Sequence, residues 1–184
     1  MAVRWSLNEL AQLGIDELPV DAVLDVKKAV KERNAQVQDV APVKVSGVIT
    51  KDQRGIIATI HVATTVTLPS SRSLTAVAVP VAFTFAEYYV SEHERDLSRF
   101  TNDDVVIQPE HDVVDLETAV AENIVLHLPL KVLSPEEEQG GNFQTGDDWQ
   151  VVSEEQLTSQ RQETVDPRLA KLKDFFADEN GDKN

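Results

Sequence analysis

Residues 56–68 constrain the fold of this chain more than any other stretch. Most of them are isoleucine, valine or threonine, whose branched Cβ atoms restrict χ1 and suit a pleated strand better than a helix. Apolar and polar residues also alternate over 43–49, and the polar turn between the two stretches ends in Gly55, a residue that adopts positive φ without strain. The pattern predicts a long β-hairpin at the centre of the chain.

Shorter elements are predicted on both sides of the hairpin. Before it, we expect a helix over 7–13 with a capping pair at Ser6 and Glu9, a strand over 20–26 and a helical turn over 27–34. After it, we expect a strand over 74–89 with a bend or edge at Pro80, a short edge strand over 105–107 and a helix over 116–128 capped by Asp115. These elements predict an α+β domain over 1–133, whose antiparallel sheet is strongly twisted or barrel-like and carries short flanking helices.

The composition changes after residue 133. Residues 134–165 are acidic and rich in Gly, Gln, Ser and Thr, so they cannot bury enough apolar area to offset the entropy of ordering. We predict an acidic flexible linker there, with one weak helical piece over 153–160. Residues 166–184 are predicted to form an amphipathic helix and tail that docks on its own domain or on a partner. The residues assigned to this docking helix are Asp166, Pro167, Arg168, Leu169 and Leu172.

Several kinds of chemistry are excluded or receive no support. The chain has no cysteine, which excludes disulfides, thiol catalysis and thiolate metal sites. Its histidines lack ligand spacing, and no serine lies in a nucleophile motif. We therefore predict no enzyme, no catalytic residue, no metal and no cofactor. Neither a secretory signal nor an apolar run long enough to span a membrane is present, and we expect a cytoplasmic protein that does not bind membranes.

The charge distribution bears on possible partners. The net charge of −15 argues against tight RNA binding, because affinity for phosphate comes from lysine and arginine. Residues 43–90 are nevertheless slightly basic. The basic cluster over 27–33 is interpreted as a solvated helix face. The residues predicted to contact a partner or RNA are Lys44, Arg54, Ser70, Arg72 and Ser73. The two arginines among them lie at successive turns.

Three stretches resemble the YceD family in their order and spacing. Residues 68–74 (LPSSRSL) are similar to its L-P-C-S-R-C-L motif, residues 114–129 to its D-L and E-x-L-L-L-x-L-P, and residues 166–173 (DPRLAKLK) to its D-P-R-L-A-x-L-K ending. The opening WSLNEL is similar to that of members from low-GC Gram-positive bacteria. Ser70 and Ser73 stand where many members have a C-x-x-C pair, so a metal role suspected for those relatives does not apply here.

The resemblance implies a role in the synthesis, processing or accumulation of large-subunit (23S) ribosomal RNA, with no catalytic residue to transfer. Two mechanisms remain open. The slightly basic β region would contact RNA, or the acidic surface and tail would hold a basic ribosomal protein or assembly factor, which is the version we favour. The alternative function is a small-molecule-binding or hydrolytic β-barrel, which would require a closed apolar pocket with converging polar groups.

Overall fold

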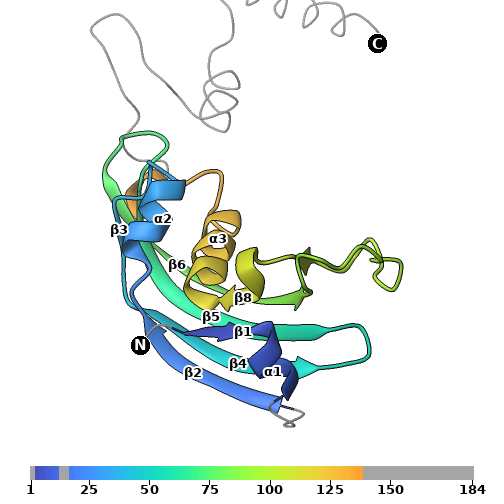
Figure 1. Cartoon of the computed structure of the whole chain (residues 1–184). Helices are drawn as coiled ribbons and strands as arrows, with labels where there is room; N and C mark the ends of the chain where they lie inside the picture. The colour runs from blue at the N-terminus through green and yellow to red at the C-terminus, as the bar shows by residue number, and fades with distance from the viewer. Residues whose placement is uncertain (1–2, 13–16, 139–184) are drawn as a thin grey trace, which may run out of the picture. The chain divides into compact units, whose positions relative to one another are not determined.

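The computed structural model describes residues 3–12 and 17–138 of the 184-residue chain (Figure 1). The chain divides after Ser134 into two units, and all the described strands belong to the first. In the second, the described residues form one helical turn, α4 (Pro135–Glu138), within the segment predicted as a linker. The predicted helical piece over 153–160 and the predicted docking helix lie outside the described residues, with Asp166, Pro167, Arg168, Leu169 and Leu172.

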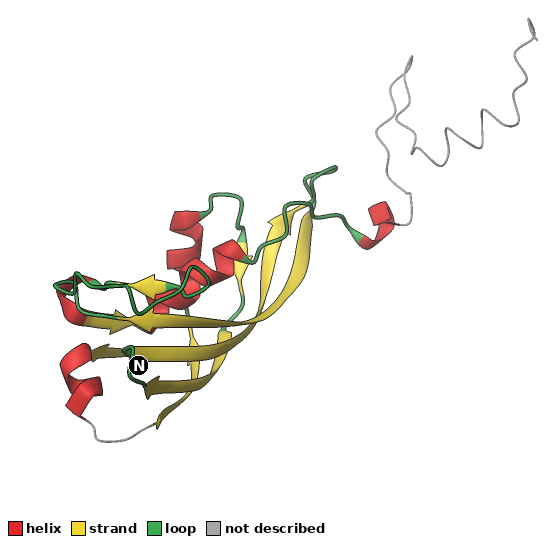
Figure 2. Cartoon of the chain, turned by 90° about the vertical axis from the view of Figure 1, so that its right-hand side faces the viewer, coloured by secondary structure: helices red, strands yellow, loops and turns green. Residues whose placement is uncertain are grey.

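The main sheet of the first unit is mostly antiparallel and open. Its strands lie in the order β2 (Glu17–Leu24), β4 (Val43–Lys51), β5 (Ile56–Pro69), β6 (Ala76–Tyr89) and β7 (Val106–Ile107), and β3 (Asp39–Val40) pairs with β5. Among these strands, β7 alone runs parallel to its neighbour. Figure 2 shows the long strands curving and twisting along their length. The predicted α+β class with an antiparallel, twisted sheet is confirmed, whereas the barrel-like alternative is wrong.

Helices bury the apolar face of the sheet without any need for barrel closure. The helices α2 (Lys27–Arg33) and α3 (Leu116–Leu126) lie against the same face (Figure 1). The α3 side chains of Leu116, Val120 and Ile124 are completely buried in one cluster with the apolar side chains of the strands. Because these helices already shield that face from water, the outermost strands do not have to pair with each other.

The hairpin of β4 and β5 confirms the central prediction. Its register places apolar side chains on one face, as in the pair of Val45 and Val62, both of which are buried. Gly47 lies opposite Ile60. A Cβ atom added to Gly47 would lie only 2.2 Å from the carbonyl oxygen of Thr59. The close approach of the two strands at this point therefore requires glycine.

Three short strands were not predicted. One is β3, and the others are β1 (Arg4–Ser6) and β8 (Val113–Asp115), which pair with each other in a separate two-stranded sheet. Strands of two or three residues carry no readable alternation. The strand β1 leads directly into the helix α1 (Leu7–Gln12), and β8 directly follows the 3-10 turn η1 (Glu110–Asp112).

The predicted helix caps are present. At α1, the Ser6 amide donates to Oε2 of Glu9 at 3.0 Å, and the Glu9 amide donates to Oγ of Ser6 at 3.1 Å. At α3, the Asp115 carboxylate accepts hydrogen bonds from the amides of Glu117 and Thr118 at 3.1 and 3.3 Å. These bonds satisfy amides that have no partner within their own helix.

Pro80 occupies an edge of the sheet, as predicted. It is paired with Thr65 of β5, whose carbonyl oxygen accepts a hydrogen bond from the Ala41 amide on the other side of that strand. The Thr65 backbone therefore points away from β6, and the pair is of the type without hydrogen bonds between its members. The position that lacks an amide hydrogen faces the free side of β6, where proline is tolerated.

Candidate functional site

The turn between β5 and β6 contains Ser70 and Ser73, two of the predicted contact residues. The Ser70 side chain is buried, and its Oγ accepts hydrogen bonds from the amides of Arg72 at 3.0 Å and Ser73 at 3.2 Å. The Ser70 amide donates to the Thr75 carbonyl at 2.7 Å, and the hydroxyl groups of Ser73 and Thr75 lie 2.8 Å apart. Both predicted serines therefore stabilise the turn itself.

This turn is attached to the segment that follows α3. The Ser71 amide donates to the Val132 carbonyl at 2.7 Å, and the Val132 amide donates to Oγ of Ser71 at 3.0 Å. The Val132 side chain is buried. These two hydrogen bonds hold the motif over 68–74 next to the segment that directly follows the motif over 114–129.

Exposed leucines lie within or next to the motifs over 68–74 and 114–129. Leu74 is 74% exposed and has a φ of 62°, a left-handed conformation that is strained for a residue other than glycine. Leu126, in the last turn of α3, and Leu130, beyond it, are also largely exposed. Apolar side chains in such positions add nothing to the core of the unit.

Arg54 lies in the turn between β4 and β5 and is held by neighbouring side chains. Its Nη1 atom donates to both carboxylate oxygens of Asp104, at 3.0 and 3.2 Å, and its Nε lies 3.5 Å from the Asp52 carboxylate. Its Nη2 donates to the Tyr88 hydroxyl, and its guanidinium carbon lies 4.5 Å from the centre of the Tyr88 ring. The Arg54 charge is therefore largely compensated within the protein.

The same cluster lowers the pKa of both carboxyl groups. At Asp52, partial burial acts to raise the pKa, but hydrogen bonds from the amides of Arg54 and Gly55 and from the Tyr88 hydroxyl outweigh it. The pKa of Asp104 is lowered mainly by the amide and hydroxyl of Thr101, with a further contribution from Arg54. Both groups are therefore ionised at neutral pH.

The predicted contact residues do not form one surface. Arg54 and Arg72 lie in turns at opposite ends of β5, a strand of 14 residues. Strands rise about 3.3 Å per residue, so up to roughly 45 Å separates the two turns. Lys44 is exposed near the start of β4, paired with Ala63 in the middle of β5. Successive turns of an antiparallel meander necessarily fall at opposite ends of the strand that they share.

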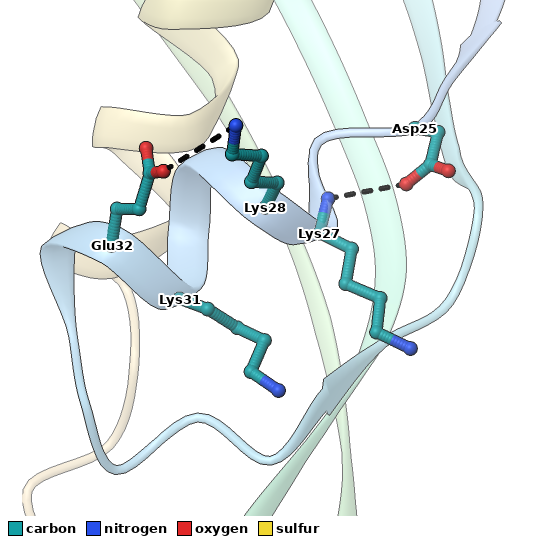
Figure 3. A pocket seen from close by; sticks show the side chains of 5 residues that line it. All are labelled: Asp25, Lys27, Lys28, Lys31 and Glu32. Carbon is teal, nitrogen blue, oxygen red and sulfur yellow. Dashed lines mark hydrogen bonds and ion pairs between the residues drawn. The ribbon is translucent and has the colours of Figure 1, made fainter.

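A groove beside α2 brings together the three lysines of the basic cluster over 27–33 (Figure 3). It has a volume of about 510 Å³ and is lined by Asp25, Lys27, Lys28, Lys31 and Glu32. The Lys27 ammonium lies 2.6 Å from the Asp39 carboxylate, and that of Lys28 lies 3.8 Å from Glu32. Lys31 donates to a backbone carbonyl at 3.2 Å. The groove is basic, but its ammonium groups already interact with the protein.

A buried polar network that includes none of the predicted site residues connects β6 with α3. Glu87 and Tyr89 of β6 face the core, and the Glu87 carboxylate accepts hydrogen bonds from the Tyr89 hydroxyl at 2.6 Å and from Nδ2 of Asn123 at 2.7 Å. All three residues are more than nine-tenths buried. One sequence signal was available: Glu87 interrupts the apolar alternation of Phe83, Phe85 and Tyr89 at a position that should face the core.

The family model described as "Large ribosomal RNA subunit accumulation protein YceD" matches residues 58–176, well over half of the chain. The chain belongs to the YceD family. The resemblance noted in the sequence is thereby confirmed, and its three motif stretches all fall within the matched residues.

A relative in the YceD family covers almost the whole chain. The uncharacterized protein YlbN of Bacillus subtilis (strain 168) is 30% identical over 171 residues, which are 92% of this chain and 94% of that protein. No solved structure matches the chain.

Two kinds of site are absent from the part of this YceD-family chain that the structure describes. Within residues 3–12 and 17–138, no group of three or more histidine, aspartate or glutamate side chains is arranged to hold a metal ion. No helix in the same ranges has the length and apolar character needed to cross a membrane.

Proposed function

We propose that this protein is a non-enzymatic ribosome biogenesis factor that supports the synthesis, processing or accumulation of 23S ribosomal RNA in the cytoplasm. It acts by holding a basic ribosomal protein or assembly factor. The family to which the chain belongs is named for accumulation of large-subunit ribosomal RNA. The proposed mode of action rests on one observation, the ion pairs that the basic side chains of the described surface form with carboxylates.

At least six of the twelve lysines and arginines in the described residues are paired with the protein's own carboxylates. The residues that form such ion pairs are Arg4, Lys27, Lys28, Arg33, Arg54 and Arg99. Phosphate binding gains free energy by releasing counterions to lysine and arginine, and an arginine that is already paired has to give up its carboxylate first. The net charge of −15 further repels RNA and attracts a basic protein.

Direct contact with ribosomal RNA is the second candidate. The α2 groove favours it, because Lys28 is highly exposed and its distance of 3.8 Å from Glu32 indicates a weak ion pair. The ligand-binding or hydrolytic β-barrel is not proposed, because the sheet is open and provides no closed barrel interior.

The proposed role is tested by depleting the protein and recording ribosome sedimentation profiles and 23S precursor levels. We expect fewer mature large subunits and altered precursor RNA, and restoration by the full-length chain. Unchanged profiles and precursor levels after depletion would overturn the proposed function.

The mode of action is tested by recovering the tagged full-length protein from cells, with separate nuclease and protease treatments. We expect a basic protein that remains bound after nuclease treatment. RNA that stays bound after protease digestion of its protein partners, but is lost with nuclease, would overturn the protein-partner mechanism. In that case a Lys28→Gln, Lys31→Gln double variant should lose the RNA. An Arg95→Gln, Lys131→Gln double variant, at exposed positions outside the groove, is the charge-matched control.

A further inference from the structure

A cleft lies where the ends of β6 and β7 meet β8 and the first half of α3. Its volume is about 480 Å³, within the range of small-ligand sites. The buried Glu87 and Tyr89 contribute to its lining, and its apolar walls are formed by Ile107, Pro109, Val113 and Ala119. We refer to it as the Glu87 cleft.

The Glu87 carboxylate is buried without a cation. The residue is 8% exposed, and its two hydrogen-bond donors, the Tyr89 hydroxyl and the Asn123 amide, are both neutral. Glu87 takes part in none of the ion pairs formed by the described residues. Burying an ionised carboxylate is costly unless a positive charge compensates it, and each oxygen can accept a further hydrogen bond.

Both donors hold the carboxylate in one orientation. Burial raises the pKa of the Tyr89 phenol, and the negative charge of Glu87 raises it further, so the phenol keeps its proton and remains a donor. The Asn123 side chain also donates from Nδ2 to the Ala119 carbonyl at 3.0 Å, which fixes its position on α3. A site whose polar groups are positioned before binding loses less entropy when its ligand arrives.

The charges around the cleft leave it negative. Arg4 also lines the cleft, but its guanidinium lies 2.7 Å from the Asp115 carboxylate. Glu122 pairs with an arginine of α2 at 3.1 Å. Glu110, on the exposed rim, forms no ion pair with any described residue. The carboxylates of Glu87 and Glu110 are therefore available to a positive charge from outside.

The backbone beside the cleft is strained. His111, which lines it, and the adjacent Asp112 have φ values of 57° and 55°. Left-handed conformations at residues other than glycine persist where the surrounding structure enforces them, and they cluster at binding sites. Here the Asp112 carboxylate accepts hydrogen bonds from the Ser91 hydroxyl at 3.0 Å and the Glu92 amide at 2.9 Å.

We propose that the Glu87 cleft binds a lysine or arginine side chain of a protein partner. The apolar walls accommodate the aliphatic stem, and the cationic head donates charge-assisted hydrogen bonds to Glu87 and is attracted by Glu110. This inference rests on the proposed function, since it identifies the surface by which the protein would hold a basic partner. A few side chains that fill desolvated pockets contribute most of the affinity of a typical interface. A basic side chain in the Glu87 cleft would be such a contact.

The inference is tested by titrating the isotope-labelled full-length protein with a blocked Gly-Arg-Gly peptide and following its amide resonances. We expect saturable shifts of the Asn123 side-chain amide and of the Ala119 backbone amide. The matching Gly-citrulline-Gly peptide, which keeps the shape but lacks the charge, should bind at least about tenfold more weakly, because a charge-assisted hydrogen bond is lost. Equal binding of the two peptides, or shifts confined to other regions, would overturn the inference.

Two variants locate the charge that binds the arginine. Glu87→Gln should weaken binding about tenfold or more, and Glu110→Gln about two- to threefold, since exposed charges contribute less. Glu117→Gln, on α3 but outside the cleft, removes the same charge and should leave binding unchanged. The rim variant keeps the test decisive if Glu87→Gln impairs folding, because Glu110 is exposed. Affinity that stays the same in both cleft variants contradicts the proposed site.

The two proposals can fail separately. If the arginine peptide does not bind, but depletion still reduces mature large subunits and Glu87→Gln restores them, the cleft inference is wrong and the proposed function stands. If depletion leaves the sedimentation profile unchanged, the proposed function is wrong whatever the cleft binds.

Discussion

The His127 imidazole is stacked on the Phe83 ring, with ring centres 3.9 Å apart and ring planes within 2° of parallel. His127 is the C-terminal capping residue of α3, and Phe83 projects from the middle of β6. The stack therefore joins the end of the helix to the sheet. It also connects the second family motif, to which His127 belongs, to the longest hairpin of the fold.

A double-mutant cycle should detect this stack. We expect His127→Ala and Phe83→Ala to be coupled by about 0.5–1.5 kcal/mol in the free energy of unfolding, as is usual for aromatic pairs. Urea denaturation of the wild type, both single variants and the double variant gives the coupling. Strictly additive effects would show that the stacked geometry contributes nothing to stability.

Replacing Ser71 should loosen the attachment between the two motifs. Ser71→Ala removes the oxygen that accepts the Val132 amide at 3.0 Å, and we expect a loss of about 1 kcal/mol in the free energy of unfolding. Ser73→Ala is the control, because the Ser73 hydroxyl contacts only residues of its own turn. Amide hydrogen exchange at Val132 should accelerate in the first variant alone, and equal protection in both would contradict the role given to Ser71.

The strain at Leu74 predicts a substitution that increases stability. Asparagine tolerates the left-handed region better than leucine, whose cost there is about 1–2 kcal/mol, and the exposed side chain loses little packing. We expect Leu74→Asn to raise the free energy of unfolding by about 1 kcal/mol. Leu130→Asn, at an exposed position without positive φ, should change it by less than about 0.5 kcal/mol. A destabilised Leu74→Asn protein would mean that the leucine side chain makes a stabilising contact.

Alanine at position 47 should disrupt the hairpin. Its Cβ would lie 2.2 Å from the Thr59 carbonyl oxygen and 2.9 Å from the Ile60 Cα, both of them backbone atoms, so the two strands would have to separate. We expect Gly47→Ala to lower the free energy of unfolding by about 3 kcal/mol, measured by urea denaturation. Ser46→Ala, on the exposed face of the same strand, should remain close to the wild type. A small effect at Gly47 would indicate that β4 can shift without cost.

The Arg54 cluster predicts a pH dependence of stability. The pKa of Asp104 is lowered in the folded protein, so its stabilising contribution is complete above the ordinary aspartate value of about 4 and is lost as the pH falls through the folded-state pKa. We expect Asp104→Asn to be less stable than the wild type near neutral pH, and its stability to fall less on acidification. Denaturation midpoints at several pH values test this. Parallel curves for the wild type and Asp104→Asn would contradict the prediction, and Asp103→Asn is the matched control.

Local signals predicted the parts of the fold that depend on neighbouring residues. The hairpin followed from the branched side chains over 56–68, and the helix starts followed from Ser6 with Glu9 and from Asp115. Both kinds of signal, the alternation of apolar residues and the capping side chains, involve residues that are close together in the sequence. The missing amide hydrogen of Pro80 predicted a bend or an edge there, and the structure shows the edge. The order of the strands was not predictable, and neither was the pairing of β1 with β8.

The site residues show the limit of local reasoning most clearly. The charge of Arg54 makes it a candidate in the sequence, but its partner Asp104 lies 50 residues away, and no short pattern connects them. Glu87 meets Asn123 at a separation of 36 residues. A charged residue at a core-facing strand position was the one available indication of that network. The sequence does not show that α3 packs against β6 and so brings Asn123 to this residue.

The missing amide hydrogen of Pro80 affects how readily a second copy of the chain can pair with the edge of the sheet. Among the strands that the structure describes, only β7 lies beside the outer border of β6, and it pairs with only the last two residues of that strand, Tyr88 and Tyr89. A second copy of the chain that tried to extend the sheet there would find, near the middle of the strand, a position that can donate nothing to the new ladder. At Pro80, the border of β6 therefore lacks one of the hydrogen-bond donors that fibrous self-assembly by strand addition would use.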